Sequence, residues 1–78
     1  MSEDAASFVR ERNAMLLACD IERAKAFYRK HNRGFRVPSD EVVEIGLHKA
    51  RTAAMSLPQA ERDYSRRWLA RRGYQAQG

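Results

Sequence analysis

The sequence contains a single cysteine and no run of apolar residues long enough to cross a bilayer. One thiol cannot form an internal disulfide or complete a zinc cluster, so stability has to come from helix packing or from a partner. A membrane-spanning helix needs about 20 predominantly apolar residues. The acidic start, Met1-Ser2-Glu3-Asp4, has the opposite charge to a signal peptide. We therefore expect a soluble protein of the cytoplasm.

Large apolar side chains are also scarce. Leu, Ile, Val and Phe together make up 14 of the 78 residues, whereas alanine alone contributes 12. A chain of this length forms one domain at most and buries only about 60% of the surface that its unfolded form exposes. A thin core of this kind excludes a large enzyme and favours a small helical binding module. We predict one helical domain over residues 1–74, followed by a flexible tail at 75–78.

Recognisable catalytic motifs are missing as well. The sequence has no G-x-S-x-G, H-E-x-x-H or glycine-rich phosphate loop. His48 follows Glu44 by four residues, and we interpret this helical pair as a solvent-facing salt bridge. His31 lies in a basic run, and Cys19 is interpreted as a buried small side chain or, alternatively, as part of a dimer seam. We expect no enzyme activity, no cofactor and no metal site.

Proline and glycine are absent from residues 2–33, which consist mostly of good helix formers. Their apolar residues fall on two stripes on nearly opposite sides of a helix, and the stripes overlap in the all-apolar segment 14–19. Such a segment is enclosed on every side or lies at an interruption. We favour a break near Asp20, whose side chain could cap a second helix starting at Ile21, over one continuous helix. Gly34 is predicted to end this helical region.

A further helix is predicted over residues 40–54. Ser39 is its expected N-cap, and Asp40 and Glu41 suit the positive end of the helix dipole. Gly46 lowers the helix propensity by about 1 kcal/mol and marks either a tolerated weak spot or a close crossing of another helix. The expected apolar stripe consists of Val43, Gly46, Leu47, Ala50, Ala53 and Ala54.

The last helix is predicted to start within residues 56–59. Ser56 and Gln59 have the spacing of a capping box, and Pro58 would lie in the first turn, where its missing N–H has no cost. Trp68, the largest apolar side chain, is the expected main anchor of the core. The expected buried stripe consists of Leu57, Ala60, Tyr64 and Trp68.

Gly73 is the predicted end of this helix, with Tyr74 packing on Leu69 as in a Schellman motif. These signals together predict an all-α fold, a small bundle of three to four helices. Because the core is thin and the segment 14–19 is apolar on all sides, one chain leaves apolar surface uncovered, so we also predict a homodimer.

The net charge is +5, and the basic residues are concentrated in two blocks. One block precedes the acidic helix start at 40–44, and the other encircles the predicted last helix. The arginine fork binds carboxylates and phosphates through paired hydrogen bonds, although surface arginine also simply solubilises small proteins. The candidate partner-binding residues are Arg29, Lys30, Arg33, Arg36, Arg62, Arg66, Arg67 and Arg71.

Nucleic acid is the alternative partner. The last two predicted helices could form a helix-turn-helix, with Gln59, Arg62 and Arg66 reaching base edges. Against this, the turn has no glycine, and Trp68 would have to be buried against its own domain. Acidic residues are interspersed with the basic ones and would repel a phosphate backbone. We therefore favour a protein partner with an acidic surface.

The second half of the chain resembles small arginine-rich helical proteins encoded by proteobacterial phages and prophages. The resemblance lies in the segments Val37-Pro38-Ser39-Asp40-Glu41-Val42-Val43, Leu47-His48-Lys49-Ala50-Arg51, Leu57-Pro58, Arg66-Arg67-Trp68-Leu69 and Arg72-Gly73-Tyr74. Proteins of that kind often inhibit host complexes, for example as anti-CRISPR proteins. The resemblance implies an inhibitor that binds a host complex handling nucleic acid in the bacterial cytoplasm. It includes no functional motif, so it assigns no site residue.

Overall fold

Four α-helices make up the part of the chain that the computed structural model describes, residues 2–31, 36 and 38–74. They are α1 (Ser2–Ala18), α2 (Ile21–His31), α3 (Asp40–Ala53) and α4 (Gln59–Arg71). These residues contain no strand, so the predicted all-α bundle is confirmed. The helix end predicted at Gly34, the candidate residue Arg33 and the tail at 75–78 lie outside the described residues. No helix within the described ranges is long and apolar enough to cross a membrane.

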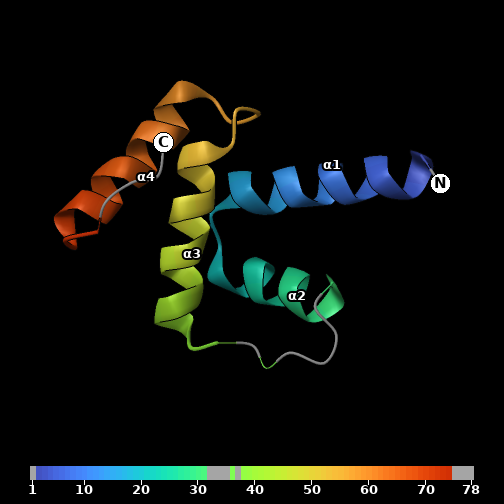
Figure 1. Ribbon diagram of the computed structural model, residues 1–78, viewed down its shortest axis with the longest axis horizontal. Helices are drawn as coiled ribbons and strands as arrows, with labels where there is room; N and C mark the ends of the chain where they lie inside the picture. The colour runs from blue at the N-terminus through green and yellow to red at the C-terminus, as the bar shows by residue number, and fades with distance from the viewer. Residues whose placement is uncertain (1, 32–35, 37, 75–78) are drawn as a thin grey trace.

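The helices form two hairpins that meet at α3. α1 and α2 lie side by side, α3 runs across the end at which they join, and α4 turns back along α3 (Figure 1). α2 and α4 lie on opposite sides of α3. The N-terminal part of α1 extends beyond α2 and projects from the rest of the molecule (Figure 1).

The predicted break between the first two helices is confirmed. α1 ends at Ala18 and α2 begins at Ile21. The carboxylate of Asp20 accepts the backbone N–H of Arg23 at 2.9 Å, which is the expected N-cap bond. Cys19 has a φ of 53° and turns the chain in the left-handed region, so that α2 can pack back against α1.

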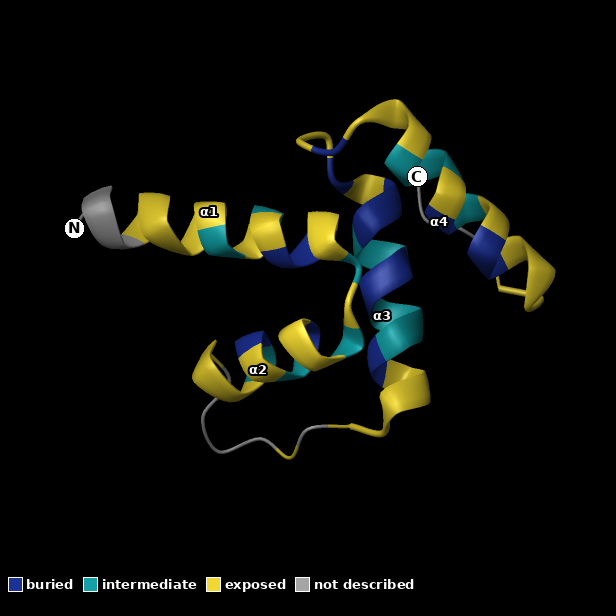
Figure 2. Cartoon of the chain, turned by 180° about the vertical axis from the view of Figure 1, so that it is seen from behind, coloured by how far each residue is buried: buried dark blue, intermediate teal, exposed yellow. Residues whose placement is uncertain are grey.

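The main hydrophobic core lies where α1, α2 and α3 meet, and Figure 2 shows the buried residues of these helices facing one another. Trp68 is buried as predicted, but it lies outside this cluster, in the seam between α3 and α4. It is therefore not the centre of the main core, because the first three helices fill that core without it. The core cluster consists of Met15, Leu16, Ala24, Phe27, Val43, Leu47, Ala54 and Leu57.

α3 begins as predicted. The hydroxyl of Ser39 accepts the backbone N–H of Val42 at 3.5 Å, and Asp40 and Glu41 occupy the first turn. The helix ends at Ala53, with Ala54 as its C-cap. A Cβ built on Gly46 would meet no atom within 4 Å among the described residues, so the close crossing considered for this glycine is wrong. Gly46 is the tolerated weak spot.

The predicted start of α4 is wrong in its cap. The helix begins at Gln59 with Pro58 as N-cap, and no side chain of the described residues caps it. The hydroxyl of Ser56 instead donates to the side-chain oxygen of Asn13 on α1 at 3.0 Å. A tertiary partner has therefore replaced the local capping box.

The buried face of α4 is also rotated from the predicted stripe. Tyr64 and Ala60 are exposed, while Ser65, Trp68 and Leu69 are buried. Arg51 and His48 of α3 are both buried, and both are hydrogen-bonded to the hydroxyl of Ser65. These hydrogen bonds turn Ser65 towards α3.

The predicted end of α4 is confirmed. Gly73 has a φ of 81°, and the N–H of Tyr74 donates to the carbonyl of Leu69 at 2.9 Å. The N–H of Gly73 donates to the carbonyl of Ala70 at 3.1 Å. These two bonds are the Schellman pair, and they require the left-handed conformation that glycine adopts without strain.

Candidate functional site

The basic residues of α4 divide into a bound pair and an exposed pair. Arg66 pairs with Asp63 at 2.9 Å and also reaches the backbone carbonyl of Thr52. Arg62 is partly buried and donates to the sulfur of Met55 at 3.3 Å. Both guanidinium groups already have partners within the protein, so they are less available to an external partner than the sequence indicated.

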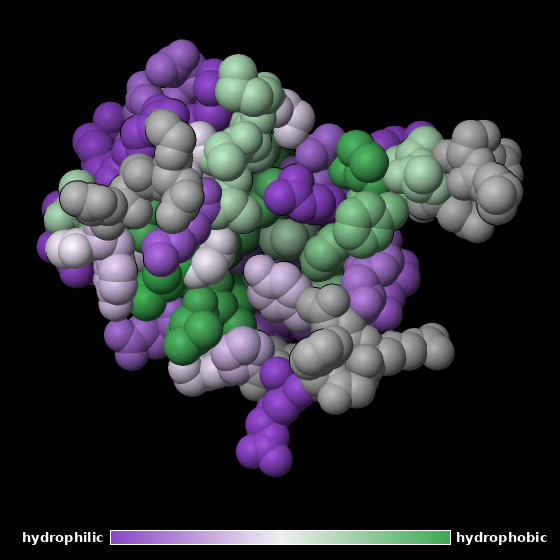
Figure 3. Space-filling view, in the orientation of Figure 1, coloured by the Kyte–Doolittle hydropathy of each residue, from purple (hydrophilic) through white to green (hydrophobic). Residues whose placement is uncertain are grey.

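Arg67 and Arg71 are exposed on the outer side of α4. Arg71 makes one long hydrogen bond, 3.4 Å, to the backbone carbonyl of Arg67. Neither guanidinium is paired with a carboxylate among the described residues, because Asp63 is bound by Arg66 and Glu61 by Arg51. Figure 3 shows hydrophilic side chains gathered over α4, at the left of the view. We call Arg67 and Arg71 the arginine face.

The second predicted cluster, at the end of α2, is less available. Lys30 pairs with Glu11 on α1 at 3.0 Å, and His31 lies 3.0 Å from the other oxygen of the same carboxylate. The hydrogen bonds from Lys30 and His31 lower the pKa of Glu11. Arg29 and Arg36 are exposed. Because α2 and α4 lie on opposite sides of α3, the two clusters do not form one patch (Figure 1).

Among the described residues, the side chain with the most hydrogen bonds is that of Arg51, for which no role was predicted from the sequence. It is fully buried. Its guanidinium donates to the carbonyl of Leu16 at the end of α1, to the hydroxyl of Ser65 at 2.7 Å and to the carboxylate of Glu61 at 2.7 Å. Arg51 thus joins α3 to the unpaired carbonyl end of α1 and to α4. Arg51 follows Leu47 by four residues and therefore lies on the apolar face of α3. This spacing could have indicated from the sequence that Arg51 is buried.

His48 is the second buried polar residue, and the predicted salt bridge with Glu44 is wrong. The imidazole is 2% exposed and stacks on the Trp68 indole, with ring centroids 4.0 Å apart and planes at 15°. Its Nδ1 lies 2.9 Å from the hydroxyl of Ser65. Burial, together with the nearby charges of Arg51 and Arg72, lowers the pKa of His48 to about 4.

The Ser65 hydroxyl group joins His48 to Arg51. Arg51 donates to the Ser65 oxygen, and Nδ1 of the imidazole lies within hydrogen-bond distance of the same hydroxyl group. On the other side of the ring, Nε2 lies 4.0 Å from the sulfur of Cys19. Burial raises the pKa of the Cys19 thiol. A raised pKa keeps the thiol protonated, and the protonated thiol is the unreactive form because the thiolate is the nucleophile.

Cys19 itself is half-buried and packs against the main core, as the first of its two interpretations stated. No group of three or more His, Cys, Asp or Glu side chains suited to a metal ion occurs in the described ranges. The polar cluster of Arg51, His48 and Ser65 joins α3 to α4, and Arg51 extends it to the end of α1.

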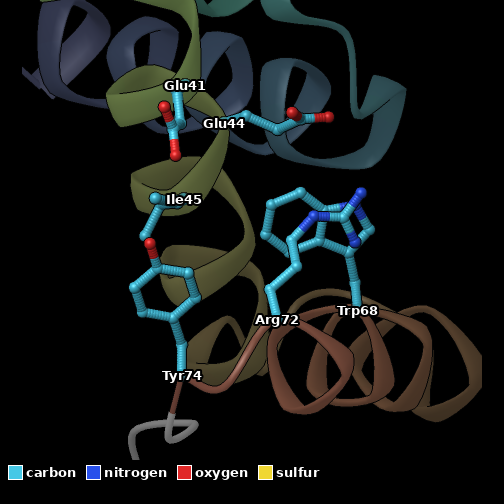
Figure 4. A pocket seen from close by; sticks show the side chains of 6 residues that line it. All are labelled: Glu41, Glu44, Ile45, Trp68, Arg72 and Tyr74. Atoms are coloured by element: carbon cyan, nitrogen blue, oxygen red, sulfur yellow. The ribbon is translucent and has the colours of Figure 1, made fainter.

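A shallow pocket of about 280 Å³ lies between the start of α3 and the end of α4 (Figure 4). In it, the Arg72 guanidinium lies in front of the Trp68 indole, with its central carbon 3.9 Å from the ring centroid. The pocket is lined by Glu41, Glu44, Ile45, Trp68, Arg72 and Tyr74.

Comparison of the chain with protein-family models, with curated proteins and with solved structures found no match.

Proposed function

We propose that this protein binds an acidic surface of a host protein complex that handles nucleic acid, and inhibits it, as anti-CRISPR-like phage proteins do. The observation that carries the proposal is the arginine face. Arg67 and Arg71 are exposed without a carboxylate partner in the described structure, whereas the acidic residues of the same helix are bound by Arg51 and Arg66. The kind of target comes from the resemblance of the second half of the chain to phage-encoded host inhibitors.

The geometry of α4 suits a protein partner. Arg67 and Arg71 are one helical turn apart, so two guanidinium forks can meet carboxylates on one partner surface. The helix is anchored by its buried face, so these side chains are presented on a rigid element. Binding of this kind needs no cofactor and no chemical step.

A nucleic-acid-binding module is the second candidate, and Tyr64 favours it. Its ring is 43% exposed and precedes Arg67 and Arg71 by three and seven residues on the same side of α4. An exposed aromatic ring beside guanidinium groups can stack on an unpaired base while the cations contact phosphates. The acidic row Glu41 and Glu44 at the neighbouring end of α3 opposes such a ligand.

The proposed function is tested with an Arg67→Glu/Arg71→Glu variant and a matched Arg10→Glu/Arg12→Glu control. The control makes the same charge change at exposed residues of α1. Each protein is used to capture partners from nuclease-treated proteobacterial lysate, with identification by mass spectrometry. The captured complex is then assayed for its own nucleic-acid activity with and without the protein.

We expect the parent and the control to capture and inhibit the same complex, and the α4 variant to lose both effects. Gel shifts with arbitrary duplex and single-stranded oligonucleotides at about 0.15 M salt form the second arm. Tight oligonucleotide binding that only the α4 variant loses would replace the proposal with the nucleic-acid module. Equal behaviour of all three proteins would rule out the arginine face.

A further inference from the structure

The pocket between α3 and α4 combines two features that attract cations. Glu41 and Glu44 place carboxylates at one side of it, and the rings of Trp68 and Tyr74 form the other (Figure 4). Aromatic faces attract ammonium and guanidinium groups through the ring quadrupole. Ile45 adds an apolar wall against which the stem of a long side chain could lie.

The two carboxylates stand out because other acidic groups nearby are neutralised. Lys25 is within ion-pair distance of both Glu22 and Asp40, and Glu11, Glu61 and Asp63 each pair with a basic residue. Glu41 and Glu44 have no such partner among the described residues, in a protein of net charge +5. The helix dipole accounts for Glu41 in the first turn of α3, but Glu44 lies beyond that turn.

Both rings of the pocket already attract cations of the chain itself. The Arg72 guanidinium lies 3.9 Å from the Trp68 ring centroid, and the Lys49 ammonium lies 5.8 Å from that of Tyr74. Arg72 thus occupies the position that an external cation would seek on Trp68. No ion pair joins Arg72 to Glu44 in the described part of the chain, so the carboxylate is available to a second cation.

We propose that this pocket binds a basic side chain, lysine or arginine, of a protein partner. The charged head lies between Glu41 and Glu44, and the aliphatic stem lies against Ile45 and Tyr74. Arg72 competes with this ligand for the Trp68 ring and for the carboxylates. The inference goes beyond the arginine face of α4, uses residues of opposite charge and is independent of that function.

The opposite assignment is an anion site, in which the Arg72 fork binds a partner carboxylate or a phosphate. The two assignments make opposite predictions for one substitution. If the ligand is a cation, Arg72→Ala removes a competitor and binding becomes tighter. If the ligand is an anion, Arg72→Ala removes the binding group and binding is lost.

The experiment uses N-acetylated, C-amidated tri-arginine as the cation probe and the equivalent tri-glutamate as the anion probe. Trp68 is the only tryptophan, so its fluorescence reports the pocket directly. Titrations at about 0.15 M salt limit the repulsion from the rest of the protein, because the Debye length is then about 8 Å. The proteins are the parent, Arg72→Ala, Glu41→Gln/Glu44→Gln and the control Glu22→Gln, which neutralises an exposed carboxylate of α2.

We expect tri-arginine to bind Arg72→Ala several-fold more tightly than the parent. The double glutamine variant should bind it about tenfold more weakly than the parent, since each exposed ion pair is worth up to about 1 kcal/mol. The Glu22→Gln control should match the parent. Weaker binding to Arg72→Ala, preference for tri-glutamate, or no saturable change in Arg72→Ala up to millimolar probe would overturn the proposal. Far-ultraviolet spectra confirm that each variant is folded.

Discussion

Arg51 shows how a single charged residue can organise a thin core. A buried guanidinium is costly to desolvate unless all its donors are satisfied. Here the donors meet backbone carbonyls at the end of α1, a hydroxyl and a carboxylate of α4. Because three helices are fixed at one group, Arg51 supplies part of the specificity that large apolar side chains supply in bigger domains.

We predict that Arg51→Lys destabilises the protein by about 3 kcal/mol or more. An ammonium group keeps the charge but cannot reproduce the planar fork, so buried acceptors on α1 and α4 lose their partners. Urea unfolding followed by Trp68 fluorescence measures the effect. Arg67→Lys is the matched control and should change the free energy of unfolding by less than about 0.5 kcal/mol, because Arg67 is exposed. Equal midpoints for the two variants would contradict the bridging role of Arg51.

His48 predicts a dependence of stability on pH. Its pKa is about 4 in the folded protein, against an ordinary value of 6.5. Between about pH 4 and pH 6.5 the unfolded chain therefore binds more protons at His48 than the folded protein does. The stability that depends on neutral His48 is complete above about pH 6.5 and is lost as the pH falls towards 4. We expect the free energy of unfolding to fall by about 2 kcal/mol from about pH 7.5 to about pH 5.

The measurement is urea unfolding across this pH range, compared with a His48→Gln variant. The variant should show a much smaller decrease, whereas His31→Gln should keep the decrease that His48 causes. A parent protein whose stability is constant over the range would show that His48 titrates normally and is not enclosed by Trp68, Ser65 and Cys19.

At the scale of the helix, the glycine within α3 and the glycine at the end of α4 should respond in opposite ways to substitution by alanine. Gly46 lies in a helical interior where an added Cβ meets no atom within 4 Å, whereas Gly73 has a φ of 81°. We predict that Gly46→Ala stabilises the protein by about 1 kcal/mol through helix propensity. Gly73→Ala should destabilise it by about 1 kcal/mol or more, since a Cβ is strained in the left-handed conformation.

Thermal unfolding of these two variants beside the parent provides the measurement, and each variant is the control for the other because the chemical change is identical. A loss of stability in Gly46→Ala would mean that another helix does approach this position. If Gly73→Ala has the same melting temperature as the parent, the Schellman motif at the end of α4 does not contribute to stability.

The helices were predictable from the sequence wherever the signal was local. Asp20, Ser39 and Gly73 each bond to backbone within their own turn, and their roles follow from residue type and spacing. Prediction from the sequence failed where a distant residue competes with a local hydrogen bond. Ser56 bonds Asn13 across the fold, and Ser65 is turned inward by α3, so neither the cap nor the buried face of α4 follows from periodicity.

The candidate site was predictable to a similar extent. Arginine clustering identified Arg67 and Arg71, which are exposed as a binding role requires. Spacing along the chain could not show that Lys30, Arg62 and Arg66 are held by residues of the protein itself. The pocket of Trp68, Tyr74 and the two glutamates joins residues up to 33 positions apart in the sequence, and only the return of α4 along α3 brings them together.

For the whole molecule, the distribution of apolar surface is uneven. The main core involves the last part of α1, whereas the N-terminal part of this helix projects from the body, and Figure 3 shows apolar side chains along it. Val9 is 52% exposed and Leu17 is 53% exposed. They lie eight residues apart, so they share one broad side of α1.

We therefore keep the prediction of a homodimer and assign it to this side of α1. Light scattering should show a dimer at high micromolar concentration, because covering a large apolar side chain is worth about 1.5–3 kcal/mol. Val9→Glu/Leu17→Glu should be monomeric, since each added carboxylate would have to be desolvated at the contact. Val42→Glu is the control, because this valine is 54% exposed but lies in the first turn of α3. A parent protein that is monomeric throughout the range would show that one chain tolerates this exposed surface. A Val9→Glu/Leu17→Glu variant that still forms the dimer would place the contact elsewhere.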